Sequence, residues 1–159
     1  MDLEIRPLKP SDREPIRSLL VATGFFRPEE VEVAMELVDR ALSDPGQEEY
    51  LFSVAEFGGE VAGYACWGET PCTRGTYDLY WVAVAPETQG KGVGRALMAF
   101  AENAMREAGG RLSVVETSGL PNYEPTRAFY LRIGYREEAR IRDYYQPGDD
   151  LVIYTRPLA

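Results

Sequence analysis

The sequence TYDLYWVAVAPETQGKGVGRALMAFAENAM, residues 76–105, decides the fold. Residues 77–84 are β-branched, aromatic or apolar almost throughout, which is typical of a strand covered on both faces. Pro86 ends this strand, because proline has no N–H to donate to a ladder. A glycine-rich segment follows, and from Val93 onward apolar residues recur at helical spacing. The order of strand, glycine-rich turn and helix predicts an α/β unit.

The turn between the predicted strand and helix has the composition of a phosphate-binding loop. Gly90, Gly92 and Gly94 can adopt positive φ, and without a Cβ they let a ligand approach the main chain. A helix also begins with unpaired N–H groups and the positive end of its dipole. Lys91 and Arg95 add positive charge. The alternative is that the glycines only form a tight turn, which is frequent in α/β proteins.

Two well-known phosphate loops do not match this segment. A dinucleotide-binding G-x-G-x-x-G that begins at Gly90 requires glycine where Arg95 stands. The nucleotide-triphosphate pattern G-x-x-x-x-G-K-[ST] fails at two positions. The pattern that does fit is Q-x-x-G-x-G, at Gln89, Gly92 and Gly94.

Composition limits the classes of function. The 159 residues, 45% of them hydrophobic, suffice for one well-filled core, so we expect a single domain over residues 1–159. The polar N-terminus and the absence of long apolar runs predict a cytoplasmic protein with no membrane partner. A net charge of −9 argues against a nucleic-acid partner and favours cationic small substrates. With no His and two Cys, we expect no metal, and catalysis by Ser-His-Asp or Cys-His is excluded.

The rest of the chain alternates helical and strand patterns. Gly58-Gly59 joins two strand patterns, which is a strong signal for a hairpin. The strand, helix and strand around the glycine loop imply a right-handed crossover. We expect helices near residues 11–22, 28–43, 93–108 and 126–132, and strands near 3–6, 50–57, 60–67, 77–84, 111–117, 135–145 and 151–156.

A second block occurs after the strand that follows the glycine loop. Residues 126–135, TRAFYLRIGY, fit A-x-x-F-Y-x-x-x-G-[FY], except that the alanine is displaced by two positions. The matching positions are Phe129, Tyr130, Gly134 and Tyr135. Together with Q-x-x-G-x-G directly after a strand that ends V-A-V-A-P, this block resembles the GNAT superfamily of N-acetyltransferases.

The resemblance implies a fold, a cosubstrate and a set of contacts. The fold is a GNAT-like α/β (mixed α+β) domain, with a mixed, largely antiparallel sheet of about six to seven strands flanked by about four helices. The cosubstrate is acetyl-CoA. The implied pyrophosphate contacts are Gln89, Gly90, Lys91, Gly92, Val93, Gly94 and Arg95. Val82, Ala83 and Val84 would pair with the pantetheine arm through their main chain, and a backbone N–H there would polarise the acetyl carbonyl.

Acyl transfer to an amine requires two proton movements. An alkylamine has a pKa near ~10.4, so a base or a water relay must take a proton, and the departing thiolate gains from a donor. The resemblance assigns these roles to Glu116 and Tyr130. Glu116 also stands near the end of an apolar strand, where α/β sheets place their sites. The alternatives are that Glu116 simply reaches solvent and that Tyr130 is a packed residue with a satisfied hydroxyl.

The expected reaction is direct acetyl transfer to a primary amine of a small molecule in a ternary complex. Asp143, Tyr144 and Tyr145 either grip the ammonium or belong to a solvated hairpin. One alternative acceptor is a protein N-terminus or lysine. Tyr123 counts against it, because ribosomal-protein N-terminal acetyltransferases have Asn seven residues before the catalytic Tyr. A second alternative is a non-catalytic acyl-CoA sensor. The sequence does not identify the acceptor amine or the preferred acyl chain, and it does not decide whether the protein forms a homodimer.

Overall fold

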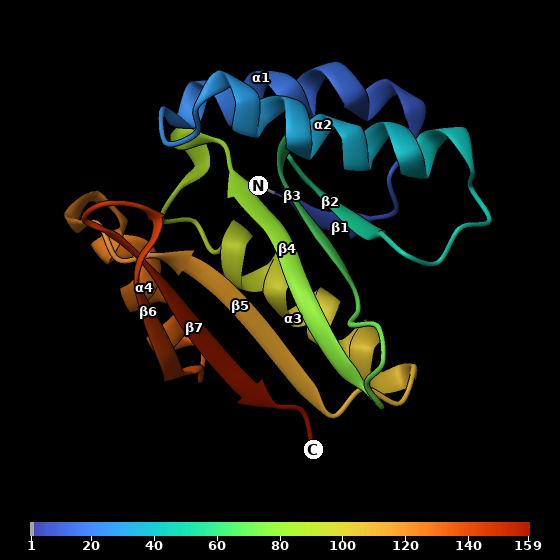
Figure 1. Cartoon of the computed structure of the whole chain (residues 1–159). Helices are drawn as coiled ribbons and strands as arrows, with labels where there is room; N and C mark the ends of the chain where they lie inside the picture. Colours follow the sequence, from blue (N-terminus) through green and yellow to red (C-terminus); the bar gives the residue numbers. More distant parts are fainter. Residues whose placement is uncertain (1) are drawn as a thin grey trace. The chain divides into compact units, whose positions relative to one another are not determined.

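A computed structural model describes residues 2–159 and gives each predicted element its bounds (Figure 1). The helices are α1 (Arg13–Thr23), α2 (Pro28–Ser43), α3 (Val93–Glu107) and α4 (Glu124–Arg132). The strands are β1 (Leu3–Arg6), β2 (Leu51–Phe57), β3 (Glu60–Glu69), β4 (Thr76–Val84), β5 (Leu112–Ser118), β6 (Arg136–Gln146) and β7 (Asp149–Pro157). Short 3-10 turns are η1 (Pro10–Asp12), η2 (Pro86–Thr88) and η3 (Pro121–Tyr123).

The strands are hydrogen-bonded in the order β1-β2-β3-β4-β5-β7-β6. The pairs β1–β2, β2–β3, β5–β7 and β6–β7 are antiparallel, while β4 and β5 are parallel. The parallel pair is the one joined through α3, as the crossover requires. The prediction of a mixed, largely antiparallel sheet with about four helices is therefore confirmed.

The chain separates into two compact units. Unit 1 extends to Gly68 and includes Trp81–Ala104, so it contains β1–β3, α1, α2, the end of β4 and most of α3. Unit 2 comprises Glu69–Tyr80 and Met105–Ala159, with the start of β4, β5–β7 and α4.

The core of unit 1 lies on both faces of β3. Tyr64 is fully buried and belongs to an apolar cluster with Leu20 of α1 and Val38 of α2. Gly63 points to the opposite face, because neighbouring residues of a strand alternate. A Cβ added there would lie 3.1 Å from Leu97 and 3.3 Å from Val93, both in α3. Burial on both faces explains the uninterrupted apolar pattern of this strand.

Turn residues behave as the sequence predicts at two places and differently at a third. Gly58 and Gly59 have φ of 64° and 84° and form the β2–β3 turn, and Gly24, with φ of 72°, ends α1. The first helix, which the sequence predicts from about residue 11, starts later than expected, because η1 intervenes and α1 starts at Arg13. The carboxylate of Asp12 accepts a 2.9 Å hydrogen bond from the backbone N–H of Lys9.

The core of unit 2 is aromatic. The ring of Tyr130 in α4 lies 5.8 Å from the ring of Tyr135 and 6.0 Å from the ring of Tyr154 in β7, measured between centroids. The hydroxyl of Tyr135 shares a 2.7 Å hydrogen bond with the hydroxyl of Ser113 in β5. These contacts fix α4 against the β5–β7 ladder.

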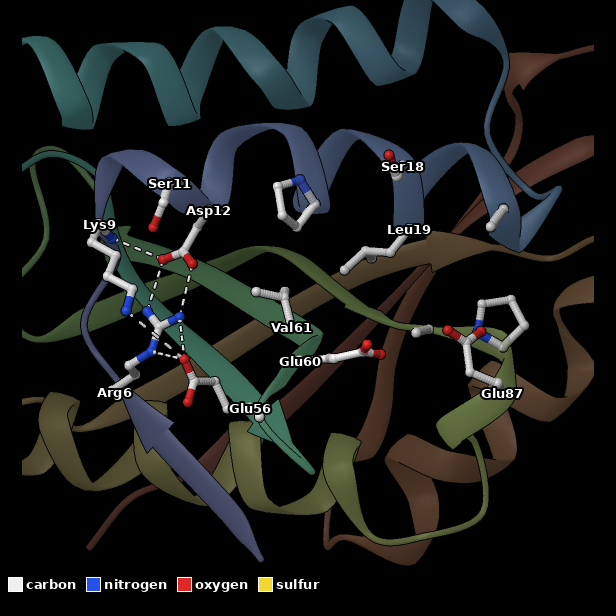
Figure 2. Close-up of a pocket in the computed structure, with 15 residues that line it drawn as sticks. Arg6, Lys9, Ser11, Asp12, Ser18, Leu19, Glu56, Glu60, Val61 and Glu87 are labelled. Atoms are coloured by element: carbon white, nitrogen blue, oxygen red, sulfur yellow. Dashed lines mark hydrogen bonds and ion pairs between the residues drawn. The ribbon is translucent and has the colours of Figure 1, made fainter.

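A buried ion pair ties the start of α1 to the first strands of unit 1 (Figure 2). Arg6 donates two hydrogen bonds of 2.8 Å to the Asp12 carboxylate and a third of 2.8 Å to Glu56. Asp12 is only 1% exposed. Burial opposes its charge, but hydrogen bonds from Arg6 and Lys9 outweigh burial and hold the pKa of Asp12 below its ordinary 3.8.

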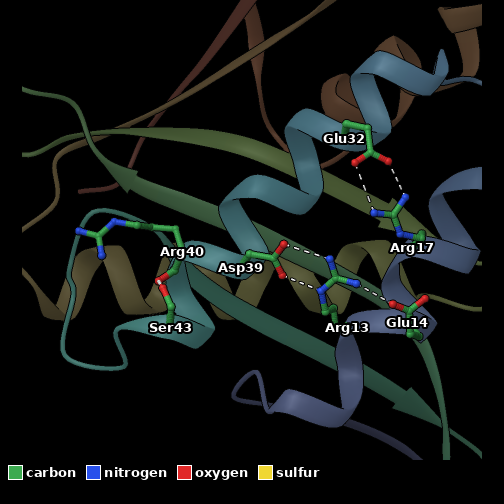
Figure 3. Close-up of polar contacts among 7 residues, drawn as sticks. All are labelled: Arg13, Glu14, Arg17, Glu32, Asp39, Arg40 and Ser43. Atoms are coloured by element: carbon green, nitrogen blue, oxygen red, sulfur yellow. Dashed lines mark hydrogen bonds and ion pairs between the residues drawn. The ribbon is translucent and has the colours of Figure 1, made fainter.

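Exposed ion pairs join α1 to α2 (Figure 3). Arg13 binds the Asp39 carboxylate through contacts of 2.6 and 3.0 Å, and Arg17 binds Glu32 at 2.6 Å. Water competes for these groups, so such pairs contribute little to stability.

We predict that Asp12→Asn lowers the free energy of unfolding by about 3 kcal/mol at neutral pH, because the half-buried Arg6 guanidinium loses the more buried of its two carboxylate partners, Asp12 and Glu56. Glu32→Gln, which breaks an exposed pair, should change it little. Since the folded pKa of Asp12 is lowered, its contribution is complete above the ordinary value and is lost as pH falls through the lowered one. Urea unfolding of both variants between neutral and acidic pH measures the free energy of unfolding. Equal losses of stability in the two variants at neutral pH would contradict the prediction.

Candidate active site

The glycine loop has the backbone geometry of an anion site. Gly90 and Gly92 have φ of 79° and 83°, a region that favours glycine. The first amides of α3 follow directly, and the helix has its first backbone bond from Ala96 N to Gly92 O at 3.0 Å. Gly94 is the second residue of α3 and does not have a positive φ. The expectation of positive φ is therefore wrong at this glycine. Helical backbone at this position is what keeps the N-terminal amides aligned.

The loop also carries positive charge that the protein does not neutralise. Lys91 and Arg95 are exposed, and neither forms an ion pair with a carboxylate anywhere in residues 2–159. The Lys91 ammonium lies 5.4 Å from the ring centroid of Phe57. In a chain of net charge −9, two unpaired cations at a helix N-terminus favour an anionic ligand.

The strand before the loop is held at its end. Ala85 N donates to Ala62 O at 2.7 Å, and Gln89 Nε2 lies 3.5 Å from Val84 O. Ala83 is buried, while Val82 and Val84 are half-buried. Their main-chain contacts with a pantetheine arm stay predictions.

Glu116 occupies an exposed position on one face of β5 with neighbours that favour its protonation. On β7 it stands opposite the apolar Ile153. Partial burial and, second, the negative charge of Asp78 raise the pKa of Glu116 above its ordinary value of 4.5. No hydrogen bond or ion pair to its carboxylate exists within residues 2–159. An unpaired carboxylate with a raised pKa has the properties of a general base.

The β6–β7 hairpin brings one tyrosine toward Glu116. The pKa of Tyr145 is raised to about 12, first by burial and then by the charge of Glu116 and by other acidic groups nearby. Asp143 has φ of 55°, donates its backbone N–H to Asp150 at 3.0 Å and accepts from Gly148 N at 2.8 Å. Its carboxylate therefore shapes the end of the hairpin.

A buried hydrogen bond fixes this hairpin to the end of β5. The hydroxyl of Ser118 donates to the Asp149 carboxylate, and Gly119 N donates to Asp150 O at 2.9 Å. Arg127 of α4 donates to the carbonyl oxygens of Ser118 and Leu120, both at 2.8 Å. The segment between Glu116 and Tyr130 is thus held at both ends.

Tyr130 stands on the other face of the β5–β7 ladder. Its ring packs on Tyr154, and strand alternation places Tyr154 opposite to Ile153 and Glu116. Burial raises the pKa of Tyr130, so its hydroxyl keeps its proton. Tyr130 is a buried residue, and within residues 2–159 its hydroxyl forms no hydrogen bond with another residue. A protonated hydroxyl without a protein partner can donate to a ligand.

Sequence reasoning missed two polar residues near Glu116, namely Asp78 and Ser118. Asp78 is the carboxylate that raises its pKa, and Ser118 and Asp149 hold the adjacent hairpin. For Asp78 there was one available signal, because a carboxylate inside a covered strand is unusual. The pairing of Ser118 with Asp149 has no local sequence signature.

A hollow of about 550 Å³ in unit 1 does not contain any predicted site residue (Figure 2). Its lining includes Arg6, Leu19, Glu60 and Glu87. In residues 2–159 no group of three or more His, Cys, Asp or Glu side chains is arranged to hold a metal ion, and no helix is long and apolar enough to cross a membrane.

Comparison with known proteins gives a family match and curated relatives. Residues 48–137 match the model of the acetyltransferase (GNAT) domain. An uncharacterized N-acetyltransferase of Methanocaldococcus jannaschii is 31% identical over 105 residues, which cover 66% of this chain and 65% of that protein. An N-alpha-acetyltransferase of Sulfurisphaera tokodaii is 29% identical over 119 residues, which cover 69% of this chain and 71% of that protein.

Solved structures agree with the fold. A protein of Desulfovibrio desulfuricans assigned to the GNAT family of acetyltransferases is 46% identical, with a TM-score of 0.95, and the match covers 99% of this chain and 100% of that one. A Salmonella typhimurium protein solved with its cofactor acetyl-CoA has a TM-score of 0.78 at 20% identity, covering 100% of this chain and 95% of that one.

We predict that Gly92→Ala weakens binding of acetyl-CoA by about 10-fold or more, because alanine opposes the positive φ that directs the loop amides. Gly24→Ala is the matched control, since Gly24 also has positive φ and, like Gly92, open space around an added Cβ. Both variants should lose similar stability, but only Gly92→Ala should lose affinity. Titration calorimetry with acetyl-CoA measures this, and unchanged affinity would remove the phosphate-loop assignment.

Proposed function

This chain belongs to the GNAT acetyltransferase family, and from that premise we propose that it transfers the acetyl group of acetyl-CoA to a primary amine of a small molecule. The transfer is direct, in a ternary complex of enzyme, acetyl-CoA and amine. No covalent acetyl-enzyme is needed, because the amine itself attacks the thioester.

The observation that carries this proposal is the glycine loop. Gly90 and Gly92 hold left-handed backbone at the start of α3, beside Lys91 and Arg95, neither of which pairs with a carboxylate within residues 2–159. A diphosphate is the ligand that such amides and charges suit best. Coenzyme A has one, so the loop accounts for cosubstrate binding.

Glu116 is proposed to act on the amine. An amine attacks only as the neutral base, and the proton it loses has to pass to an acceptor. The Glu116 carboxylate takes this proton, directly or through one water, as the nitrogen bonds to the carbonyl carbon. Its raised pKa makes it a stronger base than an ordinary carboxylate.

Tyr130 is proposed to act on the leaving group. When the carbon–sulfur bond breaks, the sulfur departs as a thiolate and gains from a proton. The buried Tyr130 hydroxyl donates it and recovers a proton from solvent before the next turnover.

The acceptor class rests on the charge around Glu116. Asp78 and Asp149 are the other carboxylates near this face, and Tyr145 adds a ring. Acidic groups and an aromatic ring favour a compact cationic amine. A protein N-terminus is the second candidate, because one relative is an N-alpha-acetyltransferase.

Thiol release from acetyl-CoA with a panel of polyamines, amino acids, aminoglycosides and short peptides tests the proposal. We expect release with at least one small amine and less with peptides. Release with peptides alone would transfer the assignment to protein N-termini. No release with any acceptor, while acetyl-CoA binds tightly, would identify a sensor and overturn the proposal.

We predict that Glu116→Gln lowers kcat by about 100-fold or more and that Tyr130→Phe lowers it by about 10-fold or more, with little change in acetyl-CoA affinity. Tyr64→Phe is the control, because Tyr64 is also buried and its hydroxyl also lacks a partner. It should keep kcat near wild type. Steady-state kinetics with the best amine measure all three, and full turnover by Tyr130→Phe would exclude it as the acid.

A further inference from the structure

Asp78 shares a face of unit 2 with Glu116. In the parallel β4–β5 pair, Asp78 stands opposite Val114 and Leu79 opposite Val115. Side chains alternate along a strand, so Val114 and Glu116 point to the same side of β5, and Asp78 points to that side from β4. The β4–β5 pairing ends at Leu79 and Val115, so Glu116 lies one residue beyond the ladder and diagonally across from Asp78.

The carboxylate of Asp78 is held in place from a third segment. Thr70, in the loop after β3, donates its hydroxyl to Asp78 Oδ2 at 2.7 Å. Asp78 is half-buried and forms no ion pair within residues 2–159. Thr70 thus orients the carboxylate without neutralising its charge.

The other groups that face Glu116 do not compensate this charge. Ile153 stands opposite on β7 and Tyr145 comes from β6, with Asp149 and Tyr123 around Tyr145. Tyr80 lies two residues after Asp78 on the same side of β4. All of these are apolar, phenolic or acidic. A negative charge on Asp78 consequently acts on Glu116 without an intervening cation.

We propose that Asp78 is a positioning residue for proton transfer, which acts through Glu116 to strengthen the base that takes the proton of the amine. This inference rests on the proposed role of Glu116. Repulsion between the two carboxylates is relieved when Glu116 is protonated. The negative charge of Asp78 therefore makes transfer of the proton to Glu116 more favourable. The same charge favours approach of the cationic acceptor.

The test is the pH dependence of kcat/KM for Asp78→Asn with the best amine. The acidic limb reports the base in the free enzyme. It should move to lower pH, because the Asp78 charge that holds the pKa of Glu116 up is gone. The plateau rate should fall a few-fold, far less than the ~100-fold expected for loss of the base. Asparagine keeps the shape of the side chain and an oxygen for Thr70, so the fold should survive.

Two variants separate a charge effect from a structural one. Asp78→Glu retains the charge and should keep its acidic limb closer to that of wild type than Asp78→Asn does. Glu107→Gln removes an exposed carboxylate at the end of α3 and should leave the profile unchanged. An acidic limb that stays in place in Asp78→Asn, or moves equally in Glu107→Gln, would overturn the proposal.

Glu116→Gln distinguishes this failure from failure of the proposed function. If it abolishes turnover while Asp78→Asn has a wild-type profile, Glu116 is the base and only the role of Asp78 is wrong. If Glu116→Gln retains full turnover, the base assignment fails, and the inference about Asp78 fails with it.

Discussion

Left-handed backbone at Gly90 and Gly92 is the constraint on which the rest of the site depends. These two residues turn the chain from β4 into α3 within a few positions. The first N–H groups of a helix have no partner within the helix, and a ligand or water can satisfy them. Lys91 and Arg95 add positive charge there, and neither forms an ion pair with a carboxylate within residues 2–159. Loop geometry and charge together favour an anion.

The glycine loop and the face around Glu116 differ in charge, as the two proposed ligands do. The loop of unit 1 is locally positive in a protein of net charge −9, and it suits an anionic coenzyme. The face of unit 2 around Glu116 is acidic and aromatic, and it suits a cationic amine. One chain thereby provides for two ligands of opposite charge. The proposed base Glu116 and the proposed acid Tyr130 both belong to unit 2.

Local signals predicted the helices and strands and the motifs. Each motif consists of residues that are adjacent in the sequence, so it can be recognised without knowing the fold. This holds for the glycine pair of the β2–β3 turn, the loop before α3 and the block around Tyr130. Asp78 and Glu116 are far apart in the sequence, and only strand register brings them together. Asp143 was expected either to grip an ammonium or to belong to a solvated hairpin, and its carboxylate accepts a backbone hydrogen bond that closes the hairpin. Register and hydrogen-bond competition were beyond sequence reasoning.

Amide chemical shifts measured by NMR during titration with coenzyme A test the central claim most directly. If the loop binds the diphosphate, the largest changes should occur at Gly90, Lys91, Gly92 and Val93. Pantetheine, which lacks the diphosphate, should leave these amides nearly unchanged. Saturable binding of coenzyme A with these amides unmoved would contradict the assignment of the glycine loop as the coenzyme site.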